Sequence, residues 1–173
     1  WYWTQRGLSD ATIVRFLLGW DGRRYTIPAV YRGIPFGVKR RQSDVDDGIP
    51  AKYISLTGSR VGIFNADTLW TAHEVVICEG EIDAMLLCQV GYNAVSSTGG
   101  AGTWKPEWAK FFAGVQNIVI LYDNDAAGRD GALKVRATLA RARIATYPDG
   151  IKDAGELFAT HAAPVNWLYN NVG

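Results

Sequence analysis

Two short apolar segments, each followed by acidic residues, constrain the fold of this 173-residue chain more than any other feature. Residues 118–121 are Ile-Val-Ile-Leu, and residues 75–78 are Val-Val-Ile-Cys. Neither segment alternates with polar residues, so both are typical of parallel strands that are buried on both faces. A helical pattern follows each segment, to about residue 142 and residue 90. The sequence therefore predicts an α/β protein built on a parallel sheet.

Acidic residues stand where each predicted strand ends. Glu79 directly follows the strand at 75–78, and Asp123 and Asp125 follow the strand at 118–121. Ligands of open parallel sheets bind at the carboxyl edge of the strands, so we expect these three carboxylates to converge there. Carboxylate oxygens suit Mg²⁺, which usually binds one or two carboxylates together with phosphate oxygens. The sequence predicts a metal site at this edge.

Helix capping is the alternative role for these acids. Asp123 or Asp125 could cap the helix that follows it. Glu81 is expected only to complement the positive end of its helix. Gly80 is expected to permit a tight turn, and Asp83 falls in the first helical turn. Capping does not explain why two separate strands both end in an acid followed by glycine and a helix.

Together the two motifs resemble the Toprim domain, which occurs in bacterial-type primases, topoisomerases of types IA and II, some nucleases and some recombination proteins. The resemblance covers about residues 74–160 and rests on Glu79-Gly80-x-x-Asp83 and Asp123-x-Asp125-x-x-Gly128. It implies a Rossmann-like parallel-sheet core. It also implies a Mg²⁺ (or Mn²⁺) site for phosphodiester chemistry, with Asp123 and Asp125 holding metal. Glu79 would hold metal or act in proton transfer, so all three are the predicted catalytic residues.

Charge is distributed unevenly along the chain, although its net value is only +1. Residues 1–60 contain ten basic and five acidic residues, whereas residues 61–173 contain eight basic and twelve acidic residues. This asymmetry is expected if the front of the chain binds phosphate and the rear binds cations. An unevenly charged solvated surface is the alternative. Residues 65–73 are expected to join the two parts, so with the resemblance we divide the chain into an N-terminal basic lobe, residues 1–73, and a Toprim catalytic domain, residues 74–173.

The basic lobe is expected to mix helix and strand. Ser9 is the predicted N-cap of a short helix whose inner face carries Ile13, Phe16 and Leu17 and which ends at Gly19. Strands are predicted at 25–30 and 34–41, which form a hairpin, and at 51–55 and 61–64. The polar segment 42–50 is expected to be a mobile surface loop.

This lobe resembles the start of the catalytic core of bacterial-type primases. The resemblance rests on the segments Arg6–Ser9, Pro35–Arg41, Ala51–Ser55 and Gly62–Asn65. It implies that basic residues grip template or nucleotide phosphate beside the metal site. Lys52 is the first candidate by motif position, followed by Lys39, Arg40, Arg41 and Arg60. Because side chains alternate along a strand, Lys39 and Arg41 should share one face and Arg40 the other. The alternative for these three is a charged strand edge that prevents aggregation.

Two later segments add candidate residues. The loop at 96–102 is rich in glycine, and Gly99, Gly100 and Gly102 form a candidate phosphate-binding loop. Just beyond it, Trp104 and Trp108 have helical spacing and are expected to lie in the core rather than to stack on bases.

The segment Lys152–Glu156 resembles a Lys-Asp-Ala-Asn-Glu signature of phage primase–helicases, with Gly155 in place of asparagine. By this resemblance, Asp153 is a further acid near the metals. The competing role for Asp153 is to cap the helix that begins near Ala154. A final short strand is expected just before it, at 144–147.

The resemblance implies the catalytic core of a phage-like or mobile-element DNA-dependent RNA primase, which makes short RNA primers on single-stranded DNA from nucleoside triphosphates. The alternatives are a Toprim nuclease and a non-catalytic module that binds single-stranded nucleic acid. Expected partners are a single-stranded DNA template, nucleoside triphosphates, and a replicative helicase or helicase domain. A zinc-binding module outside this chain is expected as well.

The remaining composition suits a cytoplasmic protein, and the resemblance implies the cytoplasm of a bacterium or a phage-infected host cell. No apolar run approaches a membrane span, and no signal-peptide pattern is present. Cys78 and Cys88 are expected as small core residues, which suits a reducing compartment. The chain starts with Trp1 instead of methionine, so we expect a fragment or a processed chain.

Overall fold

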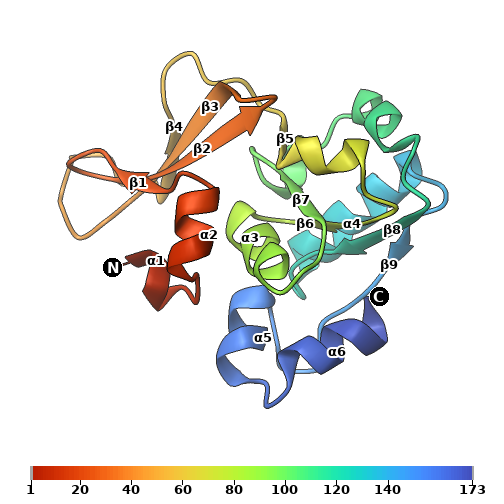
Figure 1. Cartoon of the computed structure of the whole chain (residues 1–173). Helices are drawn as coiled ribbons and strands as arrows, with labels where there is room; N and C mark the ends of the chain where they lie inside the picture. The colour runs from red at the N-terminus through yellow and green to blue at the C-terminus, as the bar shows by residue number, and fades with distance from the viewer. Residues whose placement is uncertain (1, 173) are drawn as a thin grey trace.

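Two β-sheets lie side by side in the computed structural model, which describes residues 2–172 (Figure 1). The first sheet is antiparallel, with the order β1 (Gly19–Trp20), β2 (Tyr25–Tyr31), β3 (Ile34–Arg41) and β4 (Tyr53–Ser55). The second has the order β5 (Ile63–Phe64), β7 (Ala94–Ser97), β6 (Glu74–Cys78), β8 (Asn117–Leu121) and β9 (Arg143–Ile144). Its pairings are parallel except that of β5 with β7. The α/β prediction is confirmed.

Helices cover both faces of the second sheet (Figure 1). One face carries α3 (Glu81–Gln89), α5 (Ala154–Thr160) and α6 (Pro164–Asn171), together with α1 (Tyr2–Gln5) and α2 (Asp10–Arg15) of the lobe. The other carries α4 (Ala126–Thr138) and the 3₁₀ helices η1 (Ala66–Trp70) and η3 (Pro106–Phe112), and η2 (Ala101–Thr103) lies beside α4.

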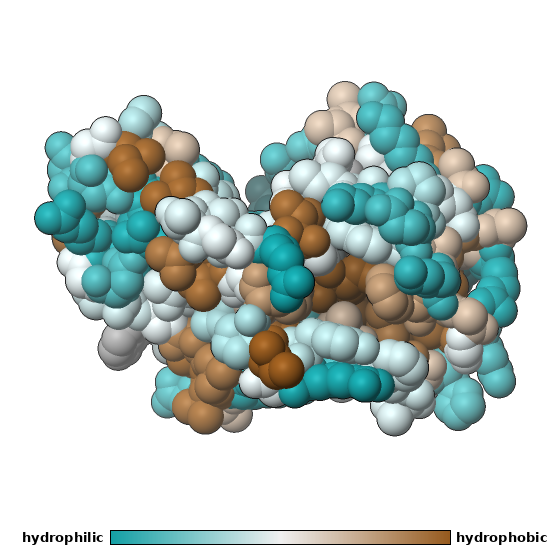
Figure 2. Space-filling view, turned by 90° about the horizontal axis from the view of Figure 1, so that it is seen from above, coloured by the Kyte–Doolittle hydropathy of each residue, from teal (hydrophilic) through white to brown (hydrophobic). Residues whose placement is uncertain are grey.

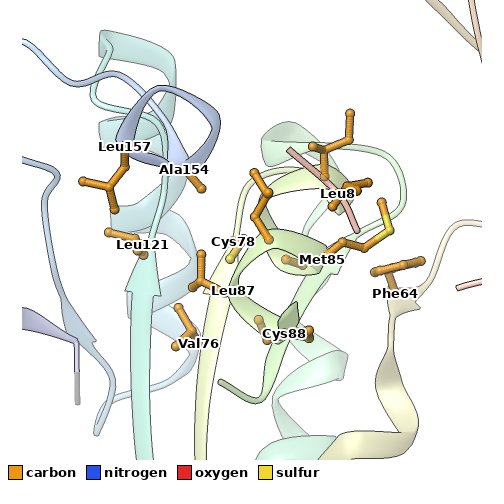
Figure 3. Close-up of a cluster of buried hydrophobic side chains, with 14 of the residues drawn as sticks. Leu8, Phe64, Val76, Cys78, Met85, Leu87, Cys88, Leu121, Ala154 and Leu157 are labelled. Carbon is orange, nitrogen blue, oxygen red and sulfur yellow. The ribbon is translucent and has the colours of Figure 1, made fainter. Parts of the chain in front are cut away.

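Alternation along the central strands explains this layering. In β6, Val76 and Cys78 pack on the α3 side, and Val75 and Ile77 pack on the α4 side. The same period-2 pattern recurs in β8. Figure 3 shows the α3-side core, where Met85 from α3 lies near Phe64 and Leu8 from the lobe. The lobe and the sheet therefore share one hydrophobic core.

The first predicted helix is confirmed, but its end is not where we expected. Ser9 caps α2 by accepting a hydrogen bond from the backbone N–H of Thr12. The helix ends at Arg15, before Gly19, because Leu17 adopts a left-handed backbone with φ +55°. That conformation usually falls to glycine at a helix end. It turns Leu17 to solvent, where it is 60% exposed, so its predicted place on the inner face is wrong.

The loop at 42–50 is anchored to the lobe by a buried arginine. The Arg24 side chain is fully buried and forms an ion pair with Asp47, with Nη2 2.9 Å from Oδ1. It also donates to the carbonyl oxygens of Ile49 (2.7 Å) and Ala51 (2.8 Å). The guanidinium holds the pKa of Asp47 at about 2. The segment 42–50 is a surface loop as expected, anchored through Asp47 and Ile49, and its mobility stays a prediction.

Several element bounds differ by a few residues from the prediction. Helix α4 ends at Thr138 rather than near Ala142, and β9 covers only Arg143–Ile144 instead of the predicted 144–147. Trp108 is buried and contacts Trp104 with ring centroids 5.6 Å apart, which confirms the core interpretation for both rings. Over residues 2–172, the structure contains no helix with the length and hydrophobicity that crossing a membrane requires.

Candidate active site

The carboxyl edge of the second sheet gathers five acidic side chains. The parallel register pairs Cys78 of β6 with Leu121 of β8, so the residues after both strands leave the sheet at the same level. Two further acids come from the first turn of α3 and from the start of α5. The set, which we call the acidic edge, consists of Glu79, Asp83, Asp123, Asp125 and Asp153.

Burial and mutual repulsion disfavour the charged forms of Asp83 and Asp123, two of these acids. Burial raises the pKa of Asp123 to about 7, with further contributions from Glu79 and Asp153. Burial likewise raises the pKa of Asp83 to about 7, and Asp123 and Asp153 add to the effect. Such coupling requires these groups to lie close together. A cation placed among them would favour their charged forms.

Glu79 has a buried carboxylate oxygen without a hydrogen-bond partner among the described residues. This atom is Oε2, and burial raises the pKa of the side chain, partly offset by a hydrogen bond from the backbone N–H of Asp123. A buried acceptor without a partner costs free energy and is uncommon in folded proteins. Glu79 is therefore suited to a ligand that supplies positive charge.

Gly128 brings the first turn of α4 against this edge. A Cβ atom built there would lie 2.1 Å from the carbonyl oxygen of Asp123 and 3.0 Å from Oε2 of Glu79. Gly80 serves a similar purpose, since its Cβ would lie 2.9 Å from Oδ2 of Asp83. The chain bends at Gly80 as expected, but its backbone is extended with φ −117° and does not need a left-handed conformation.

Asp125 and Asp153 both cap helices. Asp125 Oδ1 accepts a hydrogen bond of 2.8 Å from the N–H of Gly128, and this bond is the main cause that lowers its pKa. Asp153 Oδ1 accepts one of 2.8 Å from the N–H of Glu156. The capping alternative thus holds for both residues. Capping engages Oδ1 of each residue, and Oδ2 of Asp125 lies beside Lys152.

Lys152 supplies a positive charge beside the acidic edge. Its Nζ lies 3.1 Å from Oδ2 of Asp125 and 3.9 Å from Oδ2 of Asp123, and its side chain is half exposed. An exposed pair of this kind contributes little to stability. Lys152 belongs to the signature at 152–156, but we did not predict it as a site residue, nor Asp83. Both residues could have been identified from the sequence, because Asp83 and Lys152 each belong to a motif that carries the resemblance.

The residues present fit a divalent cation only in an open arrangement. Among residues 2–172, no three His, Cys, Asp or Glu side chains are close enough to enclose a metal ion. Mg²⁺ does not require such a cage, because it is usually held by one or two carboxylates, waters and substrate phosphates. The unpartnered oxygen of Glu79 and the raised pKa of Asp123 fit that chemistry.

Three of the predicted phosphate-binding cations contact the protein itself. Lys39 Nζ lies 2.7 Å from Oε2 and 2.6 Å from Oε1 of Glu81, which is buried. The expectation that Glu81 only complements its helix end is therefore wrong. The alternation along β3 is as predicted: Arg41 stacks over Tyr2 on the Lys39 side, whereas Arg40 pairs with Asp21 at 2.5 Å.

The other two predicted cations, Lys52 and Arg60, are exposed. Lys52 Nζ lies 5.8 Å from the ring centroid of Tyr53, at the start of β4. Arg60, Lys39, Thr98 and Gly99 line one small pocket between the lobe and the sheet. Of the predicted cations, Lys52 and Arg60 are thus the most available to an anionic ligand.

The glycine-rich loop leaves β7 at the same edge and is tightly bonded internally. Thr103 Oγ1 lies 2.6 Å from Ser97 Oγ and donates to the carbonyl of Gly100. A Cβ atom at Gly99 would lie 2.4 Å from Thr103 Oγ1, and Gly100 has φ +85°, so both positions require glycine. Gly102 has open space around it. A phosphate-binding role of Gly99, Gly100 and Gly102 remains a prediction.

Known proteins resemble this chain in sequence and fold. A family model described as Toprim-like matches residues 76–158. The Gene 57 protein of Mycobacterium phage D29 is 37% identical over 64% of this chain and 72% of that protein. The DNA helicase/primase of Enterobacteria phage T3 is 30% identical over 88% of this chain and only 28% of that protein. The primase fragment of the bacteriophage T7 primase-helicase protein has a TM-score of 0.78 at 23% identity, covering 98% of this chain and 73% of that fragment.

The fold and the strand-end acids thus define a class. This chain belongs to the Toprim-like family, and its fold is that of primase catalytic cores. It spans less than a third of the length of the T3 helicase/primase.

Proposed function

We propose that this chain is the RNA-polymerising catalytic core of a DNA primase, which makes short RNA primers on a single-stranded DNA template from nucleoside triphosphates. The acidic edge is the observation that carries this proposal. It contains a carboxylate oxygen of Glu79 without a hydrogen-bond partner among the described residues, and Asp123, whose pKa is raised by burial and by neighbouring acids. Both lie at the sheet edge where ligands bind. The relatives named DNA helicase/primase and primase-helicase support the same activity.

Glu79, Asp123 and Asp125 are the proposed metal-holding and catalytic residues, with Asp153 as a further acid. Mg²⁺ or Mn²⁺ bound there would stabilise the attacking 3′-oxygen and the leaving oxygen at the α-phosphate of the incoming nucleotide. The exposed cations Lys52 and Arg60 would hold template or nucleotide phosphate. Lys152 would balance charge at Asp125 until a ligand enters. A helicase, separate or covalently joined, and a zinc-binding module are proposed partners.

The experiment that tests this proposal is incubation of the chain with a single-stranded DNA template, nucleoside triphosphates and Mg²⁺ or Mn²⁺. We expect short RNA products that require all four components. Fragmentation of the template would instead make the chain a nuclease. Binding of the template without either product would make it a non-catalytic module. Both of these outcomes would overturn the proposal.

Asp153→Asn separates the capping role of this residue from a metal role. Asparagine caps a helix about as well as aspartate, so we expect the free energy of unfolding to stay within about 0.5 kcal/mol of the wild type. The substitution removes a negative charge that acts on Asp83 and Asp123. We therefore expect priming to require a higher Mg²⁺ concentration. Full activity of the variant at low Mg²⁺ would leave Asp153 as a helix cap alone.

Lys52→Ala tests contact with a template phosphate. Each phosphate neutralised by a protein cation releases counterions, so binding weakens as salt rises. We expect the slope of the logarithm of affinity for single-stranded DNA against the logarithm of salt concentration to decrease by about one. Lys134→Ala, an exposed substitution on α4, is the matched control and should leave the slope unchanged. An unchanged slope in Lys52→Ala would show that this side chain meets no phosphate.

A further inference from the structure

A large groove outside the acidic edge lies between the turn of the β2–β3 hairpin and the helices η1 and η3. Its volume is about 710 Å³, and most of its lining is apolar. Figure 2 views the molecule from above and shows a hollow between the lobe and the sheet domain. The groove between the hairpin turn and the two helices is called the hairpin groove and is defined by Arg32, Ile34, Arg60, Trp70, Lys110 and Phe111.

Aromatic side chains in this groove face solvent instead of the core. Trp70 is 60% exposed and Phe111 is 44% exposed, and Ile34 at the hairpin turn is 67% exposed. By contrast, Trp108, which also lines the groove, is buried at its base. Exposed apolar surface gathered in one hollow marks a binding surface, whereas scattered exposed residues do not.

Every charged side chain that lines the groove is basic. These residues are Arg32, Arg60 and Lys110, and no Asp or Glu lines it. The Arg32 guanidinium lies 4.9 Å from the ring centroid of Trp70, and Lys110 Nζ lies 5.3 Å from that of Phe111. Asp67 accepts two hydrogen bonds from the backbone N–H of Arg32 and so holds the hairpin turn in place. The occupant should therefore be anionic and should carry flat apolar groups.

We propose that the hairpin groove binds single-stranded nucleic acid, with bases stacked on Trp70 and Phe111 and phosphates held by Arg32, Arg60 and Lys110. Cations alternating with exposed aromatic rings are the usual means of binding single strands without sequence preference. An amphipathic acidic peptide is the competing occupant. It is less well matched, because each ring here is accompanied by a cation, as stacked bases with adjacent phosphates require.

The groove continues toward the catalytic edge. Arg60 and Val61 line both the hairpin groove and the smaller pocket that contains Lys39 and Gly99. Gly99 follows β7 at the carboxyl edge of the sheet. A strand bound in the groove would thus be directed toward the edge of the sheet from which the acids project. In identifying this strand as template or primer, the inference rests on the proposed function, but binding itself does not require catalysis.

The test is the affinity of single-stranded DNA, measured by fluorescence anisotropy with a labelled oligothymidylate long enough to span both sites, without metal. Loss of one stacked base costs about 1–3 kcal/mol, so we expect Trp70→Ala to weaken binding roughly 10-fold. Lys110→Ala should reduce the salt slope by about one. The matched controls are Tyr169→Ala, which removes an exposed aromatic side chain on α6, and Lys134→Ala on α4. Neither should change affinity or slope.

Wild-type affinity and slope in both groove variants would overturn this inference and leave the groove to a protein partner. That failure is distinguishable from failure of the proposed function. If the wild type makes primers and Trp70→Ala binds DNA as well as the wild type, the groove inference is rejected and the proposed primase activity is retained. If Trp70→Ala binds DNA more weakly and the wild type makes no primers, the groove inference is supported and the proposed primase activity is rejected.

Discussion

Asp123→Asn is expected to abolish primer synthesis, with a loss of at least about 100-fold, and to stabilise the metal-free protein. Catalysis is lost because asparagine keeps the shape of the side chain but not the charge that would hold the cation. Stability rises because the charged form of Asp123 is disfavoured by burial, Glu79 and Asp153. A pKa shift of one unit corresponds to about 1.4 kcal/mol, and we expect a gain of about 2 kcal/mol at neutral pH.

The pH dependence of this gain has a definite sign. Asp123 has a pKa of about 7 in the folded chain and an ordinary value of 3.8. Between these values the folded state binds more protons than the unfolded state, so stability falls as pH rises through this window. In Asp123→Asn, this fall should be smaller. Urea unfolding in EDTA at pH 5 and pH 8 measures it, and Asp130→Asn, an exposed acid on α4, is the control. Wild-type priming by Asp123→Asn would contradict the assignment.

Lys39→Met is expected to destabilise the chain by about 3 kcal/mol at neutral pH. Lys39 on β3 pairs with Glu81 on α3, and Glu81 is only 5% exposed. Removing one partner of a buried ion pair leaves an uncompensated charge and typically costs 3–5 kcal/mol, whereas replacing both partners with apolar groups can be nearly neutral. Chemical denaturation of Lys39→Met and of the double variant Lys39→Met/Glu81→Leu should therefore show the double variant to be the more stable.

The deficit of Lys39→Met should also shrink in acid. Burial raises the pKa of Glu81 above its ordinary 4.5, and Lys39 opposes that rise. Without Lys39, the pKa of Glu81 rises further, so the carboxyl becomes neutral at a higher pH and no longer needs a partner. The difference from the wild type should be largest at neutral pH and smallest near pH 4.5. A deficit that is independent of pH would mean that the lysine contributes by packing and not by charge.

Local patterns predicted the elements that build the acidic edge. Apolar strands without alternation predicted β6 and β8, and the acids directly after them had to leave the sheet at its carboxyl edge. The same local reasoning identified Ser9 as a helix cap. It failed at Leu17, where a left-handed backbone ends α2 without the expected glycine. Tertiary packing of Phe16 and Leu18 in the shared core outweighs local preference there.

The buried ion pairs could not be predicted from local sequence. Lys39 lies 42 residues from Glu81, and Arg24 lies 23 residues from Asp47. No sequence feature next to Lys39 or Arg24 distinguishes it from an exposed basic residue. Both ion pairs are therefore evident only in the folded structure, where segments distant in sequence lie together. The charge asymmetry of the sequence therefore overstated the number of cations available for phosphate. The burial of Asp83 likewise could not be predicted from local sequence, because it depends on how α3 packs.

The two cysteines make this chain convenient for site-specific spectroscopy. Cys78 and Cys88 are the only thiols in the sequence, both are buried, and burial raises the pKa of each. Thiolate is the form that reacts with maleimides, so the native thiols should resist labelling while the chain is folded. A single cysteine introduced at exposed Tyr169 could then carry a fluorophore or spin label without removal of either native residue.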